Sequence, residues 1–373
     1  MSLRRSSGFV RYAISCQYHG SSFLGFVYQG NQEDQINQHG TDLRGYRSVE
    51  GRIREALEDF LGSSADYENI QVSSRTDRGV HALKNTFHVD ILHSNSSAIK
   101  TQEEMERRLR RGLNYHLGRQ VSSWDRDQHF QKRKRQRSKV PANYTYFSDS
   151  YWARYSANDE LKILSVKQAP DFMDNPYSKQ DTSQPPTVDW NARFSATERT
   201  YVYRLLCYPS QDGNWSVPFE WDRSWRIRSR SMNYEAMQEA ALSMEGTHDF
   251  SSFRASKCIR KSPVVTMKSI KVHSQPYGPW NILGGDQGLW TGQDGLDSDY
   301  PIPQLVSIRI VGNSFLYRQV RNMVGCLAQV GTGKIDPGDI KGLLEQKDRR
   351  KAPTMAPAHG LFLADVKHGD FHL

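Results

Sequence analysis

The chain has 373 residues, which is more than one hydrophobic core usually serves, so we expect two domains. No apolar run is long enough to cross a bilayer, which excludes a membrane-spanning protein. The net charge of +9 favours a polyanionic partner such as nucleic acid, although a basic protein without such a partner fits the charge equally well. The four cysteines form no C-x-x-C pair, so neither a zinc knuckle nor a redox motif is expected.

The first half of the chain combines strand and helix patterns. Apolar and polar residues alternate over 10–16 and again over 87–91, as in half-buried strands. Ser48 can cap a helix whose apolar stripe runs through 49–61. Leucines and a methionine that step by four over 105–117 predict a second amphipathic helix.

The second half repeats this arrangement. Residues 199–207 alternate as a strand does, and 306–310 do so again. A helix is expected over roughly 233–245. Apolar spacing from Leu316 to Val330 predicts a further helix, which Gly331 can end.

These patterns predict an α+β protein with a mixed, mainly antiparallel sheet flanked by helices, because strict strand–helix alternation is absent. We expect an N-terminal α+β domain over 9–190 with polar inserts at about 30–47 and 119–159. A C-terminal α+β domain is expected over 191–373 with a glycine-rich insert at about 274–303. The inserts are interpreted as surface excursions.

The stretch Ser74–Ala82 is the most informative in the chain. Asp77 follows a strand pattern and precedes Gly79, which can adopt positive φ. Three such residues alone indicate only a surface turn. The whole stretch, however, resembles the R-T-D-x-G-V-H-A signature of the tRNA pseudouridine synthase A family at every fixed position. That resemblance predicts the family's two-domain fold, with an active-site cleft between the domains.

Further motifs resemble the same family and follow its order along nearly the whole chain. They are Tyr18–Gly25, Leu113-Asn114, Ala192–Thr197 with Tyr201 and Tyr203, Gly246–Arg254, Ser314–Gly325 and Ala356–Leu361.

The resemblance implies an isomerase that converts uridine to pseudouridine in RNA. Asp77 would attack or deprotonate the target ribose, so that the bond between C1′ and N1 breaks and C5 bonds to C1′ instead. A carboxylate suits a sugar centre with oxocarbenium character, as in retaining glycosidases. No metal or other cofactor is expected, because nothing is oxidised and no phosphate moves.

Two further residues receive roles from the resemblance. Tyr201 matches the family's active-site tyrosine, which packs on the target base, whereas Tyr203 on the same strand face is a candidate core neighbour. Arg321 matches the arginine that pairs with the catalytic carboxylate, which a guanidinium can hold in a fork. Arg318 is interpreted as a nearby residue outside this pairing.

Arg75 and His81 belong to the same signature as Asp77. In the family the arginine at the position of Arg75 is associated with extruding the target nucleotide and holding the RNA backbone. His81 is interpreted as a structural hydrogen-bonding residue rather than as a catalytic base.

The chain departs from bacterial members of the family after the first motif. Gly25 is followed by Phe26-Val27-Tyr28, where bacterial members usually have Gly-Trp-Gln. The chain most resembles the eukaryotic pseudouridine synthase-like branch of animals, which is associated with mitochondria; cytoplasm and nucleus are the alternatives. The resemblance further implies the tRNA anticodon stem-loop as substrate, with messenger RNA as a second candidate, and a homodimer.

Two matters stay open at this point. The run Lys132–Lys139 carries six positive charges in eight residues and fits RNA contact, disorder or a nuclear import signal. The main rival function is a non-catalytic RNA-binding protein or RNA chaperone of the same fold. Such a protein would have no reason to keep Asp77, Tyr201 and Arg321 together. A glycosidase would need a second carboxylate near Asp77, and the motifs offer none.

Overall fold

The computed structural model describes residues 6, 8–27, 48–92, 101–119, 160–175, 187–208, 220–229, 232–277 and 303–373. The chain divides into two compact units, which are described separately below. Unit 1 comprises Met1–Thr76, Ala82–Ser195 and Phe371–Leu373, and unit 2 comprises Asp77–His81 and Ala196–Asp370.

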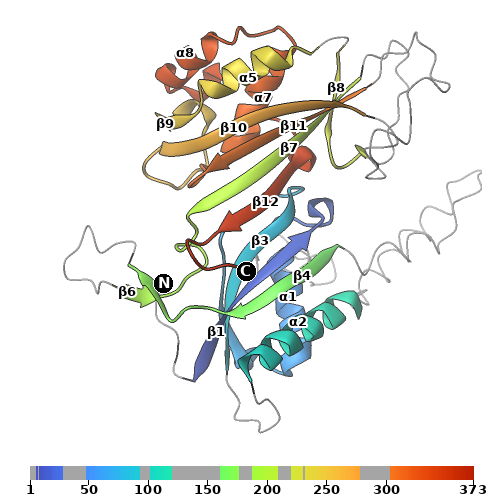
Figure 1. Ribbon diagram of the computed structural model, residues 1–373, viewed down its shortest axis with the longest axis vertical. Coiled ribbons are helices and arrows are strands. Elements are labelled where there is room, and N and C mark those ends of the chain that lie inside the picture. Colours follow the sequence, from blue (N-terminus) through green and yellow to red (C-terminus); the bar gives the residue numbers. More distant parts are fainter. Residues whose placement is uncertain are drawn as a thin grey trace, which may run out of the picture. The chain divides into compact units, whose positions relative to one another are not determined.

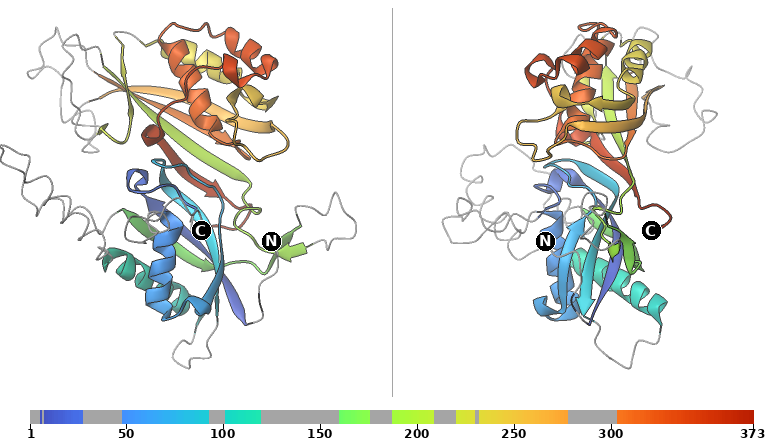
Figure 2. Two further views of the ribbon diagram at one scale, coloured as in Figure 1. Left: turned by 180° about the vertical axis from the view of Figure 1, so that it is seen from behind. Right: turned by 90° about the vertical axis from the view of Figure 1, so that its left-hand side faces the viewer.

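Unit 1 is built on an antiparallel sheet with helices on one face (Figures 1 and 2). Its central strand, β1, pairs with β3 on one side and with β4 on the other, and β2 also pairs with β3. A separate ribbon joins β5 to β6. The elements are β1 (Phe9–Tyr18), α1 (Val49–Leu61), β2 (Tyr67–Val72), β3 (His81–Leu92), α2 (Gln102–Arg119), β4 (Leu161–Gln168), β5 (Phe172–Asp174) and β6 (Thr187–Asp189), with single turns of 3-10 helix at Gly20–Ser22 and Ser64–Asp66.

The predicted cap of α1 is confirmed. The Ser48 hydroxyl accepts a hydrogen bond of 2.9 Å from the backbone N–H of Gly51, which satisfies one of the free donors of the first turn. Gly62 ends the helix in the left-handed conformation at φ 92°. Ile53 and Leu57 lie on the buried face of the helix, as the apolar stripe predicted.

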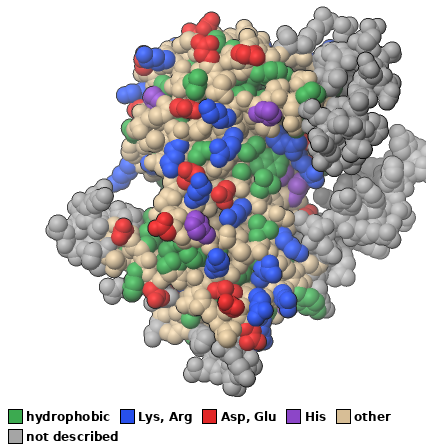
Figure 3. Space-filling model, in the orientation of Figure 1, with side chains coloured by type: hydrophobic (Ala, Val, Ile, Leu, Met, Phe, Trp, Pro, Cys, Tyr) green, Lys and Arg blue, Asp and Glu red, His purple; other side chains and the backbone are tan. Residues whose placement is uncertain are grey.

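Helix α2 presents a basic face to solvent. Lys and Arg side chains gather over this helix (Figure 3), and Arg107, Arg108, Arg110 and Arg111 are all exposed. A groove of about 560 Å³ runs between α2 and β4. It is lined by Arg110, Arg111, Asn114, Tyr115, Lys162, Ile163 and Leu164.

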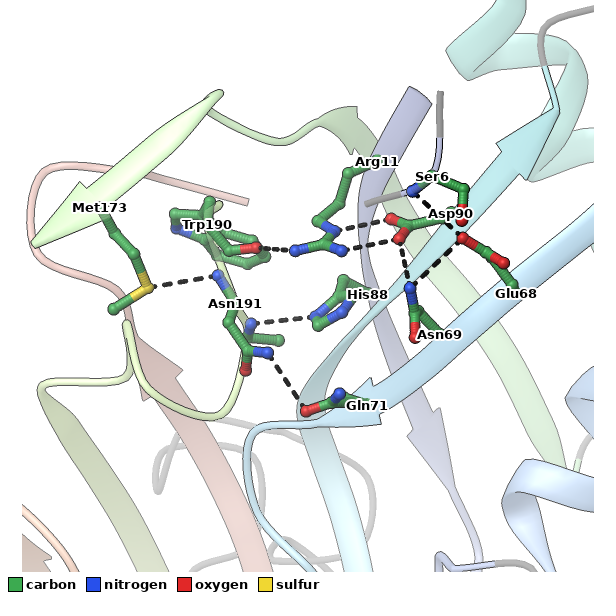
Figure 4. Close-up of polar contacts among 11 residues, drawn as sticks. Ser6, Arg11, Glu68, Asn69, Gln71, His88, Asp90, Met173, Trp190 and Asn191 are labelled. Atoms are coloured by element: carbon green, nitrogen blue, oxygen red, sulfur yellow. Dashed lines mark hydrogen bonds and ion pairs between the residues drawn. The ribbon is translucent and has the colours of Figure 1, made fainter. Parts of the chain in front are cut away.

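A buried ion pair fixes the end of unit 1 where the chain leaves β6 (Figure 4). Arg11 Nε and Nη2 each donate to Asp90 at 2.6 Å, and Nη1 donates to the carbonyl oxygen of Trp190 at 2.5 Å. His88 Nδ1 accepts the N–H of Ala192 at 3.0 Å. Burial, and then the charge of Arg11, lowers the pKa of His88 to about 3. The neutral imidazole therefore belongs to the folded state, and this network positions the start of the Ala192–Thr197 motif.

Unit 2 consists of a mixed, mainly antiparallel sheet with helices on one face (Figures 1 and 2). Its strand order is β12-β7-β11-β10-β9 with antiparallel neighbours, and β8 pairs parallel to β7. The strands are β7 (Glu198–Tyr208), β8 (Trp225–Arg228), β9 (Gly246–Asp249), β10 (Val264–Pro276), β11 (Gln304–Gly312) and β12 (Leu361–Lys367). The helices are α5 (Tyr234–Leu242), α7 (Gln319–Gly331) and α8 (Asp339–Gln346), with 3-10 turns at Ser251–Phe253, Arg349–Lys351 and Ala358–Gly360.

The predicted α+β class, with a mixed and mainly antiparallel sheet and flanking helices, is confirmed. None of the described helices is both long and apolar enough to span a membrane. The cleft expected between the halves stays a prediction. The inserts at 30–47 and 119–159, apart from Arg119 at the end of α2, lie outside the described residues, as does the basic run 132–139.

The end of the third insert differs from its prediction. Residues 274–276 were expected in a glycine-rich loop, but they continue β10 and pair with 304–306 of β11. Backbone hydrogen bonds extend the pairing of β10 with β11 there, although these residues lack the apolar alternation that indicates a strand in sequence. Residues 278–302 of this insert lie outside the described part of the chain.

Helix α7 begins later than predicted but ends at Gly331, as predicted. Leu316 was expected within the helix, but Arg318 adopts φ 61°, which is left-handed, and α7 starts only at Gln319. Gly331 is the last helical residue, whereas the positive φ of 72° belongs to Gly333. Gly331 serves close packing instead, because a Cβ there would lie 2.6 Å from the Sδ of Met237 on α5.

The partition of the chain also differs from the boundary expected near residue 190. Residues 191–195 group with unit 1, and Asp77–His81 group with unit 2 rather than with the N-terminal domain. The contacts of the second segment explain its grouping, because Asp77 pairs with α7 and His81 hydrogen-bonds to residues beyond 220. The candidate catalytic carboxylate therefore belongs to unit 2.

Candidate active site

Asp77 opens a tight turn in unit 2. The N–H of Val80 donates to the carbonyl oxygen of Asp77 at 3.1 Å, and Gly79 has φ +80°, as the third residue of a type II turn requires. A Cβ on Gly79 would also lie 3.3 Å from the Cβ of Ala358. The glycine therefore sets the turn that presents the Asp77 side chain, which is 24% exposed.

Arg321 connects this carboxylate to the C-terminal motif. Its Nη1 lies 3.4 Å from Oδ2 of Asp77, while its Nε donates to the carbonyl oxygen of Ala356 at 2.8 Å. The N–H of Ala356 returns a hydrogen bond of 3.1 Å to the carbonyl oxygen of Arg321. Burial lowers the pKa of Arg321, and the charge of Asp77 opposes that shift. The two-pronged fork expected from the family is absent here, since only Nη1 contacts Asp77 while Nε binds Ala356.

Arg318 contacts the same oxygen of Asp77, although the sequence placed it outside the pairing. Its Nε lies 3.7 Å from Oδ2, and its side chain is 40% exposed. The left-handed φ of 61° is uncommon for a residue with a side chain and directs Arg318 toward Asp77 before α7 begins. Both arginines meet Oδ2, whereas Oδ1 has no hydrogen-bond partner among the residues that the structure describes.

Tyr201 and Tyr203 occupy different surroundings on β7. The ring of Tyr201 meets Phe315 edge to face, with centroids 5.0 Å apart. Phe315 belongs to the segment that also carries Arg318, so one segment contacts both Tyr201 and Asp77. Tyr203 is fully buried, and its hydroxyl donates to the carbonyl oxygen of Pro357 at 2.8 Å. Tyr203 therefore lies in the core, where burial raises the pKa of its hydroxyl.

The Ala356–Leu361 motif holds several of these residues in place. Besides the contacts to Arg321 and Tyr203, the carbonyl oxygen of His359 lies 3.1 Å from His81 Nε2. That nitrogen also faces the carbonyl oxygen of Asp222 at 2.9 Å, so it carries the proton. The His81 ring stacks on Phe362 at 4.6 Å. This geometry agrees with the structural role expected for His81.

The remaining sequence candidates lie in unit 1. Arg75 is exposed, as a residue that contacts RNA must be. Asn114, from the Leu-Asn element, exchanges two hydrogen bonds of 2.9 Å with the backbone of Ile163 and so ties α2 to β4. Phe26 is fully buried against Tyr18 and Phe87. The position that departs from the bacterial motif is thus part of the core.

The sequence patterns did not predict two contributions to the site. The carbonyl groups of residues 356, 357 and 359 orient Arg321, Tyr203 and His81, which side-chain patterns do not reveal. Arg318 was set aside because the family's arginine matches the position directly before Asn322, which is Arg321. Within the described residues, no three His, Cys, Asp or Glu side chains gather as metal ligands would. The expectation of a metal-free reaction rests on its chemistry alone.

Known proteins resemble this chain over most of its length. A sequence profile of the family described as "tRNA pseudouridine synthase" matches residues 240–368. The tRNA pseudouridine synthase A of Allorhizobium ampelinum is 26% identical over 96% of this chain and 95% of its own length. The tRNA pseudouridine synthase-like 1 of Mus musculus is 29% identical over 89% of this chain and 91% of its own length. The tRNA pseudouridine synthase A of Caulobacter vibrioides is 27% identical over 96% of this chain and 99% of its own length.

Proposed function

Because the chain belongs to the tRNA pseudouridine synthase family, we propose that it converts uridine to pseudouridine in tRNA, with Asp77 as the catalytic carboxylate. The observation that carries this proposal is the contact of Arg321 and Arg318 with one oxygen of Asp77, at 3.4 and 3.7 Å. Two guanidinium groups orient the carboxylate through Oδ2. The other oxygen, Oδ1, is thereby presented to substrate.

The reaction is an isomerisation, so its atoms balance without a co-reactant. The bond between C1′ and N1 of uracil breaks, the detached base turns, and a bond forms between C5 and C1′. The hydrogen on C5 leaves as a proton, and N1 gains a proton. Asp77 supports the electron-deficient C1′, either by bonding to it or by removing the C2′ proton, and the nearby guanidinium groups balance its charge when the sugar cation develops.

Tyr201 is proposed to pack its ring on the target base. It is 7% exposed, and Phe315 fixes the ring from its edge. An aromatic face suits a pyrimidine that has left its stack. Arg75 is proposed to hold the RNA backbone, which its exposure permits.

We propose the anticodon stem-loop of tRNA as the region that is modified, with messenger RNA as a further substrate class. The exposed arginines of α2 support an RNA partner (Figure 3), because cations contribute to RNA affinity through phosphate contacts. A homodimer and a mitochondrial location are further proposals that rest on the family resemblance. Analytical ultracentrifugation and fractionation of cells that express the tagged chain test these two.

Tritium release tests the proposed reaction. Unmodified tRNA transcripts carrying [5-³H]uridine are incubated with the purified protein, and tritium in the solvent counts each new bond at C5. Single uridine-to-cytidine changes in the anticodon stem-loop then identify the position. Release that stops with one such change supports the proposal. Tight binding of every transcript without release would favour the RNA-binding protein or chaperone instead.

A further inference from the structure

Ile259 is the most exposed large hydrophobic residue in the part of the chain that the structure describes. It is 85% exposed, compared with 62% for Phe172, the next most exposed large hydrophobic residue of the described chain. It lies in the 254–263 loop of unit 2, which connects the 3-10 turn at Ser251–Phe253 to β10. A single exposed isoleucine is common on protein surfaces, so its exposure alone indicates nothing. The hydrogen bonds of the loop distinguish Ile259 from an ordinary exposed hydrophobic residue.

One guanidinium group fixes the backbone on both sides of Ile259. Nη2 of Arg254 donates to the carbonyl oxygen of Cys258 at 2.8 Å and also to the carbonyl oxygen of Arg260. The N–H of Cys258 donates to the carbonyl oxygen of Ala255 at 3.1 Å and closes a turn. Ile259 therefore lies between two peptide groups that Arg254 holds by hydrogen bonds. The ordered backbone of the loop keeps its side chain in solvent.

The loop is attached to the segment that carries the site. The N–H of Ala255 donates to the carbonyl oxygen of Tyr317 at 3.2 Å, and Nη1 of Arg260 donates to Ser314 Oγ at 2.8 Å. Between these two anchors lies Phe315, which contacts Tyr201, and directly after them lies Arg318, which contacts Asp77. The position of Ile259 is thus coupled to the residues proposed to handle the target nucleotide.

The charge of the loop suits a phosphate backbone. Residues 254–263 contain four cations and no acidic residue. Arg254 and Arg260 are used in the internal hydrogen bonds described above, whereas Lys257 and Lys261 are exposed on either side of Ile259. An apolar tip between cations is the arrangement that proteins use when a side chain inserts between bases and nearby cations hold the phosphates.

We propose that Ile259 is a positioning residue that inserts into the base stack next to the target uridine and fills the space that the uridine leaves. Lys257 and Lys261 hold the flanking phosphates. This inference rests on the proposed function and adds a residue that stabilises the extruded nucleotide. Extrusion costs stacking free energy for an ordered base and less for one that is already unstacked. The contribution of Ile259 should therefore depend on how well the target is stacked.

The test compares Ile259→Ala with the wild type on two RNA substrates. One is an anticodon stem-loop with its target uridine stacked, and the other presents the same uridine in a bulge. We expect Ile259→Ala to lower kcat on the stacked substrate by about tenfold and to retain nearly full kcat on the bulged one. Leu242→Ala, a matched control at another exposed position, should retain activity on both. Equal kcat for Ile259→Ala and the wild type on both substrates would overturn the proposal.

A second readout separates this inference from the proposed reaction. 2-Aminopurine beside the target uridine reports loss of stacking when the protein binds, whether or not product forms. The wild type should raise its fluorescence and Ile259→Ala should not, while Lys257→Gln/Lys261→Gln should weaken binding in a salt-dependent way and raise the fluorescence normally at saturation. If the wild type and Ile259→Ala differ in fluorescence as expected but no tritium is released, pseudouridine formation is refuted and the insertion of Ile259 is not. The same fluorescence rise in Ile259→Ala as in the wild type would refute the insertion of Ile259 and leave the proposed reaction untouched.

Discussion

Asp77 and Arg321 meet through a single oxygen, because Arg321 divides its guanidinium between Asp77 at 3.4 Å and the carbonyl oxygen of Ala356 at 2.8 Å. The second bond anchors the arginine to the backbone of the C-terminal motif. The position of the carboxylate therefore depends on that motif, which lies far from it in sequence. Arg318 adds a weaker contact to the same oxygen from the turn before α7.

Arg321→Lys should lower turnover far more than RNA affinity. A lysine is a single point charge and cannot donate to Ala356 while it contacts Asp77. We expect kcat to fall by about 100-fold, as for a misplaced catalytic group, with the Kd for tRNA nearly unchanged. Arg318→Lys is the matched control and should lose less, because Arg318 is more exposed and makes the longer contact. Equal losses in kcat and affinity would contradict the orienting role.

Substitutions of the two tyrosines of β7 should have different effects, one on stability and the other on activity. Tyr203→Phe removes the donor to Pro357 and leaves a carbonyl oxygen without it, so the free energy of unfolding should fall by about 1–2 kcal/mol. Tyr201→Leu removes the proposed stacking surface, and kcat/KM should fall by about tenfold or more. Urea unfolding and tritium release measure the two effects. A loss of activity confined to Tyr203→Phe would reverse the assignment.

Gly360 should tolerate no side chain. A Cβ at this position would lie 2.7 Å from the ring of Tyr203 and 2.9 Å from the carbonyl oxygen of Arg204. Gly360→Ala should therefore lower the free energy of unfolding by about 1–3 kcal/mol, as overpacking does. Gly342→Ala in α8 is the control, since nothing lies within 4 Å of its Cβ, and it should stabilise the helix by about 0.5–1 kcal/mol. Thermal unfolding that ranks the variants in the opposite order would contradict this packing.

His88 should make stability depend on pH. Its folded pKa of about 3 lies below the ordinary value of 6.5, so the unfolded chain binds more protons between these values. The contribution of the neutral imidazole is complete above pH 6.5 and is lost as the pH falls, by up to about 1.4 kcal/mol per pH unit. His88→Asn keeps an acceptor for Ala192 and removes the titration, so its stability should change less between pH 7 and pH 5. Exposed His273→Asn should keep the wild-type slope.

Local patterns predicted most of the elements, because amphipathic spacing and caps are local properties. Ser48 and the stripe behind it are an example. The Arg11–Asp90 pair could not be predicted, since its members are 79 residues apart and either could have been a surface charge. Strand pairing likewise extended β10 beyond its apolar pattern.

The candidate site was predicted in part. The signature around Asp77 and the motif around Arg321 identified two residues that the structure brings together. The contact of Arg318 depends on a backbone angle that its residue type does not favour, and the anchoring of Arg321 depends on a carbonyl group that every residue possesses. Neither leaves a signal in a single sequence.

Pseudouridine formation by Asp77→Asn is the measurement that shows whether the Asp77 carboxylate performs the chemistry. Asparagine keeps the size of the side chain and a hydrogen-bond acceptor but removes the charge. We expect the wild type to release tritium from [5-³H]uridine in an unmodified tRNA anticodon stem-loop, and Asp77→Asn to bind this RNA with similar affinity and release none. Product formation by Asp77→Asn at the wild-type rate would show that another group performs the chemistry.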